Sequence, residues 1–140
     1  MENITIRPIK EEDYKLINKW WEQIGKLPPP RSLLPENGLH GLIACKNERP
    51  IVCTYIYLTN SKFGYADYMI SDNSYKGRDR FDIILKLMNM CIGTGFKLGC
   101  EDFWFVTKSK GVLKRCKALG AKVSEDPYYL ICSSNSKKEI

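Results

Sequence analysis

Histidine is almost absent from this chain of 140 residues: His40 is the only one, and the six cysteines include no C-x-x-C pair. Structural zinc sites are built from closely spaced Cys and His ligands, so the sequence argues against a metal site. The wide spacing predicts buried free thiols at Cys45, Cys53, Cys91, Cys100, Cys116 and Cys132.

The chain also lacks a long apolar run. None approaches the roughly 20 residues that cross a bilayer. The start, MENITIRPIKEED, lacks the apolar block of a signal peptide. These two absences predict a cytoplasmic protein without membrane partners.

What the chain has is a balanced composition, with 44% hydrophobic and 27% charged residues, and a net charge of +6. A length of 140 residues fits one domain with a real core, followed by a frayed tail at 134–140. The charge is unevenly divided, because residues 1–70 carry a balance of +1 and residues 71–140 a balance of +5. The second half should therefore attract an anionic partner, either nucleic acid or a phosphorylated cofactor.

The first half predicts a strand around residues 4–8 and a helix over 11–24, in which Tyr14, Ile17, Trp20, Trp21 and Ile24 follow helical spacing. Four prolines then exclude a regular helix from 26–41, which should be a surface loop. Three β-rich runs follow, and we expect them to form an antiparallel meander: 42–45, 50–58 and 64–71.

The second half predicts a long, largely buried helix over 78–98, with Phe81, Ile84, Met88 and Phe96 in its apolar stripe. The run DFWFVT that follows is strongly apolar, which predicts a strand buried on both faces in the middle of the sheet. A basic helix over 110–119 and a last strand, YYLICS, complete the chain.

This order predicts an α/β (α+β) protein with a mixed, mostly antiparallel sheet and helices on both faces, in the order β-α-β-β-β-α-β-α-β. The strands before and after the long helix should be parallel neighbours joined by a right-handed crossover.

The loop DNSYKGRDR joins the third meander strand to the long helix and carries three basic residues and a glycine. It leads into a helix N-terminus, where unpaired N–H groups and the helix dipole favour an anion. It is therefore a candidate phosphate-binding loop, although ordinary loops also have this composition.

Several segments in this order resemble the GNAT superfamily of acyl-CoA-dependent N-acetyltransferases. They are ITIRPIKEEDYKLINKWW, GLIACKNERPIVCTYIYL, ADYMISDNSYKGRDR, KLGCEDFWFV and VLKRCKALGAKV, and together they span nearly the whole chain. The K-x-R-D run differs from the usual Arg/Gln-x-x-Gly-x-Gly/Ala pattern and looks more like compact GNAT-type proteins of bacteriophages.

The resemblance implies acetyl-CoA as the cofactor, wedged between the two parallel strands where they splay apart. Its pantetheine arm would add to the backbone of Tyr68, Met69 and Ile70. Its pyrophosphate would lie on the loop, whose contacts would come from Tyr75, Lys76, Gly77, Arg78, Asp79 and Arg80.

For catalysis the resemblance implies Asp67 as the base that takes a proton from the acceptor amine. The family's usual tyrosine acid is replaced by Cys116, a poor hydrogen-bond donor. Ser109 stands where the family often has asparagine and could hold a water or the thiolate.

The acceptor pocket would be walled by Trp20, Trp21 and the segment 27–38. The acceptor would be a primary amine of a small molecule or a protein, and the chain a monomer or homodimer. Two alternatives stay open: a GNAT-fold protein that binds CoA without turnover, and a small basic nucleic-acid binder that stacks bases on aromatic residues. The second is disfavoured because the aromatics fall at core spacing.

Overall fold

The computed structural model describes residues 3–124, and these fall into two compact units that divide after Val106. The first unit contains β1 (Ile4–Pro8), α1 (Tyr14–Gln23), β2 (Gly41–Lys46), β3 (Arg49–Leu58), β4 (Phe63–Ser71), α2 (Arg80–Lys97) and β5 (Asp102–Phe105). It also has three short 3-10 helices at Glu11–Asp13, Arg31–Leu33 and Pro35–Gly38. The second unit contributes α3 (Lys110–Ala118).

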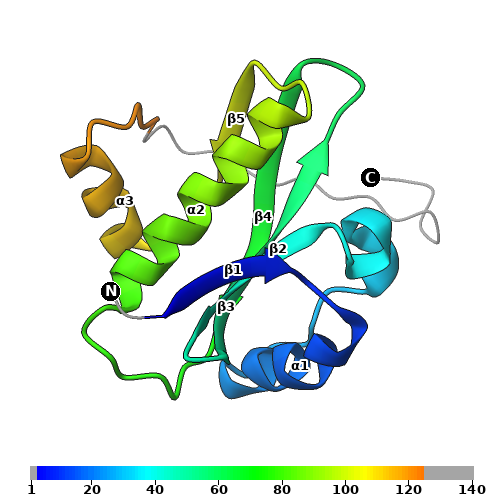
Figure 1. Cartoon of the computed structure of the whole chain (residues 1–140), viewed down its shortest axis with the longest axis vertical. Coiled ribbons are helices and arrows are strands. Elements are labelled where there is room, and N and C mark those ends of the chain that lie inside the picture. Colours follow the sequence, from blue (N-terminus) through cyan, green and yellow to red (C-terminus); the bar gives the residue numbers. More distant parts are fainter. Residues whose placement is uncertain (1–2, 125–140) are drawn as a thin grey trace. The chain divides into compact units, whose positions relative to one another are not determined.

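The five strands form one sheet in the order β1-β2-β3-β4-β5 (Figure 1). The first three pairings are antiparallel and only β4 and β5 are parallel. The mixed, mostly antiparallel sheet and the parallel pair joined by a crossover helix are therefore confirmed. The predicted last strand, Tyr128, Tyr129, Cys132 and the tail lie outside the described residues.

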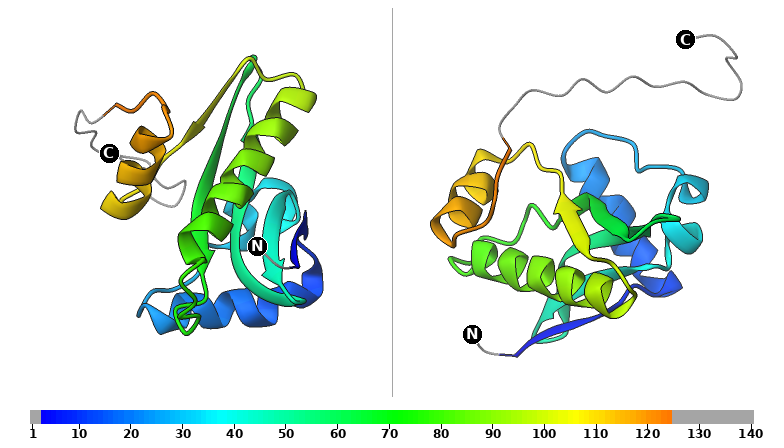
Figure 2. Two further views of the ribbon diagram at one scale, coloured as in Figure 1. Left: turned by 60° about the vertical axis from the view of Figure 1, so that its left-hand side comes forward. Right: turned by 90° about the horizontal axis from the view of Figure 1, so that it is seen from above.

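Helices cover both faces of the sheet (Figure 2). On one face, the core contains Ile17 and Trp20 of α1 together with Cys53 and Tyr55 of β3. On the other face, α2 packs on β2 and β3, with Ile83, Leu87 and Cys91 fully buried at the centre of its stripe. None of the helices in residues 3–124 is long and apolar enough to cross a bilayer.

The stripe of α2 differs from the prediction at its C-terminal end. Phe96 is 52% exposed, because the preceding Gly95 faces the sheet, where an added Cβ would lie 2.4 Å from the ring of Phe103. A helix turns by about 100° per residue, so Phe96 points away from that contact.

The prediction that β5 is buried on both faces was wrong. It is the end strand of the described sheet and pairs only with β4, and Trp104 is 58% exposed. A continuous apolar run indicates a strand buried on both faces only when other elements pack against both faces of the sheet at that strand. Here Trp104 packs edge-on against Phe63, on the face opposite to Phe103.

Other expectations are met in detail. Gly25 ends α1 with a φ of +70°, which glycine adopts without strain. The proline segment contains only 3-10 turns and no α-helix. Among the described cysteines, Cys45, Cys53 and Cys91 are buried free thiols, whereas Cys100 and Cys116 are half-buried.

Candidate functional site

A bulge interrupts β4 in the middle of the sheet. Cys53 pairs with Ile70 and Tyr55 pairs with Asp67, so two residues of β4, Tyr68 and Met69, lie opposite one residue of β3. Tyr68 has a φ of +57°, a conformation that side chains other than glycine rarely adopt. A bulge of this kind bends a strand and increases its twist.

Thr54 is the residue opposite the bulge, and it is fully buried. Its hydroxyl donates a 3.0 Å hydrogen bond to the carbonyl of Asp67. The Asp67 carboxylate accepts a 2.7 Å hydrogen bond from the N–H of Tyr68 through one of its oxygens. The bulge therefore fixes both the backbone and the side chain of Asp67, while the second carboxylate oxygen accepts no hydrogen bond from residues 3–124.

The bulge coincides with the point where β4 and β5 separate. Their parallel pairing runs from Phe63 to Ala66 on β4 and stops there. Within residues 3–124, no strand pairs with the β5 side of Asp67–Ser71, so this edge of β4 is free. A free strand edge can accept the backbone-like amides of an extended ligand.

The loop after β4 is anchored to α1. Asp72 accepts hydrogen bonds from the N–H and hydroxyl of Ser74, from the Gln23 amide and from Arg49. Gln23 also accepts a 2.7 Å bond from the N–H of Asn73. Burial by itself would raise the pKa of Asp72, but these bonds outweigh it and hold the pKa well below its usual range.

Arg80, at the start of α2, fixes the conformation of the loop through hydrogen bonds to its backbone. Its guanidinium donates to the carbonyls of Asp72 and Tyr75, at 2.8 and 3.1 Å, and to the hydroxyl of Ser71. These contacts occupy Arg80 with the protein's own backbone, so its side chain shapes the loop instead of extending from it.

A second cluster fixes the far end of the loop. Asp79, which precedes α2, accepts a 2.6 Å hydrogen bond from Lys46 and a short one from the hydroxyl of Tyr75. Hydrogen bonds from Lys46 and Tyr75 lower the pKa of Asp79. The carboxylate is thus neutralised locally by a cation on β2.

The middle of the loop is left free for a ligand. Within the described part of the chain, the N–H groups of Lys76, Gly77 and Arg78 have no hydrogen-bond partner, and the two basic side chains are exposed and unpaired. A Cβ on Gly77 would lie 2.2 Å from the Tyr75 hydroxyl, so only glycine fits there. Three free amides and two free cations close to a helix N-terminus make this stretch a candidate anion site.

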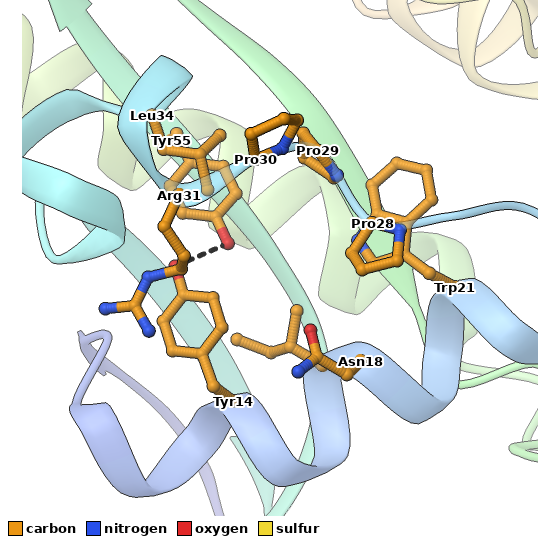
Figure 3. Close-up of a pocket in the computed structure, with 10 residues that line it drawn as sticks. Tyr14, Asn18, Trp21, Pro28, Pro29, Pro30, Arg31, Leu34 and Tyr55 are labelled. Carbon is orange, nitrogen blue, oxygen red and sulfur yellow. Dashed lines mark hydrogen bonds between the residues drawn. The ribbon is translucent and has the colours of Figure 1, made fainter.

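A pocket of about 260 Å³ lies on the α1 side of the sheet, between α1 and the proline segment (Figure 3). Its lining residues are Tyr14, Ile17, Asn18, Trp21, Pro28, Pro29, Pro30, Arg31, Leu34 and Tyr55.

The floor of this pocket is a pair of phenols. The hydroxyls of Tyr14 and Tyr55 are 2.9 Å apart, and Tyr14 donates a 2.6 Å bond to the carbonyl of Gly38. Burial is the main cause that raises the pKa of each phenol, so both stay protonated near neutral pH.

Arg31 lies at the rim of the pocket, with its guanidinium carbon 3.7 Å from the centre of the Tyr14 ring. It forms an ion pair with Glu11 at 2.6 Å and donates to the carbonyl of Asn37 at 2.7 Å. Stacking and pairing together hold this cation against the proline segment.

The pocket and the β4 edge share one face of the sheet. Tyr55 and Asp67 are direct cross-strand partners, and such partners project to the same side. Tyr57 and Tyr68 pack against the core cluster that contains Tyr55. Asp67 is therefore the cross-strand neighbour of the pocket residue Tyr55, and the free edge of β4 begins at Asp67.

The predicted tryptophans divide between two roles. Trp20 is 2% exposed and belongs to the core, which corrects its assignment to the acceptor site. Trp21 is half-buried and lines the pocket, as do Pro28–Pro30, Arg31 and Leu34 of the predicted wall 27–38.

Ser109 and Cys116 lie in the second unit. The Ser109 hydroxyl accepts a 3.2 Å bond from the N–H of Val112 and so caps α3. Burial raises the pKa of the Cys116 thiol, which keeps it protonated. The predicted roles of both residues remain predictions.

Sequence reasoning missed Tyr14 and Tyr55 as pocket residues and Lys46 as a partner of the loop. Tyr14 follows core spacing on its helix, and no local pattern shows that its ring edge borders a cavity.

No family model and no curated protein matches the chain. Several solved structures do match its fold. One is an acetyltransferase of Trypanosoma brucei, which matches with a TM-score of 0.63 and 16% identity over 93% of this chain and 100% of that one. Aminoglycoside acetyltransferase AAC(6')-Iy, in complex with a CoA bisubstrate analog, matches with a TM-score of 0.64 and 15% identity over 95% of this chain and 100% of that one.

A third match is an aminoglycoside acetyltransferase from an uncultured soil metagenomic sample, in complex with sisomicin. It has a TM-score of 0.64 and 14% identity over 94% of this chain and 97% of that one. The chain therefore shares the fold of these acetyltransferases, which is the fold that the resemblance to the GNAT superfamily implies. These matches do not support the narrower resemblance to bacteriophage proteins.

Proposed function

We propose that this protein is an acetyl-CoA-dependent N-acetyltransferase that acts on a primary amine. The observation that carries the proposal is the arrangement on β4, where a bulge, a free edge and an anion site at the start of α2 follow one another along the chain.

The residues fit coenzyme A in three respects. The free edge of Tyr68–Ile70 suits the amides of a pantetheine arm. The amides of Lys76, Gly77 and Arg78 and the two basic side chains suit a pyrophosphate. Asp79, the acidic residue of the loop nearest to them, is already neutralised by Lys46 and does not oppose an anion.

Three residues assigned to cofactor contact from the sequence act differently in this proposal. Arg80 and Asp79 hold the loop in shape through their bonds to the backbone and to Lys46. Tyr75 is 9% exposed and supports Asp79 through its hydroxyl. Direct contact with phosphate is assigned to Lys76, Gly77 and Arg78.

Bound acetyl-CoA would supply an acetyl thioester as the activated acyl group. Asp67 would accept a proton from the incoming ammonium through the oxygen that Tyr68 does not hold, since only a neutral amine is a nucleophile. The pocket beside Tyr55 would position the acceptor on the same face of the sheet.

A second candidate function is CoA binding without turnover. It is favoured by the second unit, where the Ser109 hydroxyl is used to cap α3 and Cys116 is a protonated thiol, a weak hydrogen-bond donor. Neither group is well suited to protonate a departing thiolate.

Thermal shift measurements with acetyl-CoA, desulpho-CoA and duplex DNA separate the candidates, because a ligand that binds only the folded state raises the melting temperature. Both candidates with CoA predict shifts with the two CoA forms and none with DNA. No shift with either form at millimolar concentration would exclude both of them.

A further inference from the structure

The pocket between α1 and the proline segment has a composition that selects among amines. We propose that it binds the flat, apolar body of an acceptor with a single amino group, and that it disfavours polyamines and aminoglycosides. This inference rests on the proposed function and gives the chemical class of its acceptor.

The walls of the pocket are rigid and flat. Trp21 and Pro28 lie beside each other at one end, and Tyr14 and Tyr55 form the other end (Figure 3). Aromatic rings and prolines lose little conformational entropy when a ligand binds, and their faces complement a planar apolar group. The walls therefore favour a ring over a branched polar body.

The size of the pocket suits one such group. A volume of about 260 Å³ corresponds to roughly eight or nine water molecules at about 30 Å³ each. That space accommodates one ring with a short side chain. The several sugar rings of an aminoglycoside would have to remain outside.

The charge of the pocket lining also disfavours an acceptor with more than one ammonium group. None of the described residues that line the pocket is acidic, and its one charged residue is the cation Arg31. The nearby Glu11 is engaged by Arg31 through both carboxylate oxygens. A second ammonium group in the pocket would lose its water without gaining a carboxylate, which is unfavourable.

The phenol pair provides one place for one amino group. A hydroxyl has a single proton, and Tyr14 donates its proton to the carbonyl of Gly38. Tyr55 must therefore donate to Tyr14 across their 2.9 Å contact, and the Tyr55 oxygen keeps its lone pairs as acceptors. An N–H group that meets this oxygen would lie on the same face of the sheet as the cross-strand partner of Tyr55, the proposed base Asp67.

The probes are 2-phenylethylamine as the flat monoamine, and spermidine and kanamycin as the polycations. Binding of each is measured without acetyl-CoA by saturation-transfer NMR, and transfer is measured by thiol release. We expect kcat/KM for 2-phenylethylamine to exceed that for spermidine or kanamycin at least tenfold. Equal or better use of a polycation would overturn the inference, as would absence of NMR binding by 2-phenylethylamine.

Two variants connect this preference to the pocket. Trp21→Ala should weaken 2-phenylethylamine binding at least tenfold, whereas Leu16→Ala, an exposed change on the same helix, should leave it unchanged. Asn18→Asp places a carboxylate in the lining and should improve spermidine binding several-fold. No effect of either Trp21→Ala or Asn18→Asp would show that the amines bind elsewhere and would overturn the inference.

Failure of this inference is distinguishable from failure of the proposed function. A chain that binds acetyl-CoA and acetylates kanamycin or spermidine better than 2-phenylethylamine contradicts only the acceptor class. A chain that binds 2-phenylethylamine at Trp21 but shows no acetyl-CoA binding contradicts the proposed function and leaves the selectivity of the pocket measurable by NMR.

Discussion

Tyr55 and Asp67 are direct cross-strand partners on β3 and β4, at the position where the register shifts and β4 bulges. One belongs to the floor of a pocket, and the other begins the stretch of β4 that β5 does not pair with. In the proposed mechanism, Asp67 is the proton acceptor between the acceptor pocket and the free strand edge. This relationship makes Asp67 the first residue to test.

Asp67→Asn should lower kcat by about 10²-fold to 10⁴-fold, the usual contribution of a general base. The amide keeps the size of the side chain and can still accept the bond from Tyr68, so acetyl-CoA binding should not change. Steady-state thiol release and calorimetric titration with acetyl-CoA measure the two quantities. Asp102→Asn, an exposed change on β5, is the control. Unchanged kcat in Asp67→Asn would remove Asp67 from the role of base.

The double variant Lys76→Glu with Arg78→Glu should weaken acetyl-CoA binding about a hundredfold, or about 2.8 kcal/mol. Both side chains are exposed and unpaired beside the free loop amides, so the fold should not be affected. Lys86→Glu, an exposed change in the middle of α2, controls for net charge and should have little effect. The same affinity in both variants would place the anion away from the loop.

Gly77→Ala should weaken acetyl-CoA binding and lower the free energy of unfolding by about 1–2 kcal/mol. The new Cβ would meet the Tyr75 hydroxyl at 2.2 Å, and this hydroxyl is held by Asp79. Gly93→Ala is the matched control, because a Cβ there meets nothing within 4 Å.

In the interior of α2, the Gly93→Ala control should increase stability by about 0.5–1 kcal/mol. Urea unfolding of the two variants provides the comparison. If Gly77→Ala were as stable as the original chain and bound acetyl-CoA equally well, the loop would not need the close approach of Gly77 to Tyr75.

Asp72 should make stability depend on pH. Its pKa in the folded chain is held below the ordinary value of about 3.9, so its stabilising contribution is full above that value and is lost as the pH falls below about 4. Asp72→Asn should reduce the free energy of unfolding by about 2 kcal/mol at pH 7, and the difference should shrink at pH 3. Urea titrations at the two pH values test this, and a constant difference would mean that Asp72 is not held as a charged group.

The order of elements could be predicted from the sequence because it follows from periodicity. Alternation at Ile4 and Ile6 and helical spacing at Tyr14, Ile17 and Trp20 are local patterns, and the structure confirms the predicted strands and helices as far as α3. The position of β5 could not be predicted this way. An apolar run such as DFWF does not show how many strands will pair with it, since this depends on residues far away in the chain.

The location of the candidate site could be predicted from the sequence, but the separate roles of its residues could not. The loop at 72–80 shows three cations in the sequence, yet only the structure shows that Arg80 binds backbone carbonyls while Lys76 and Arg78 remain free. The bulge at Tyr68 also has no sequence signal, because it results from the register between β3 and β4 and not from a glycine.

The most direct test of the proposed transferase activity is release of free thiol from acetyl-CoA in the presence and absence of 2-phenylethylamine, with the acetylated amine identified by mass spectrometry. The proposal predicts release above the amine-free rate, matched by acetylated product, and loss of both in Asp67→Asn. Saturable acetyl-CoA binding without thiol release, across this amine and a broad panel of others, would contradict the transferase and favour a protein that only binds CoA.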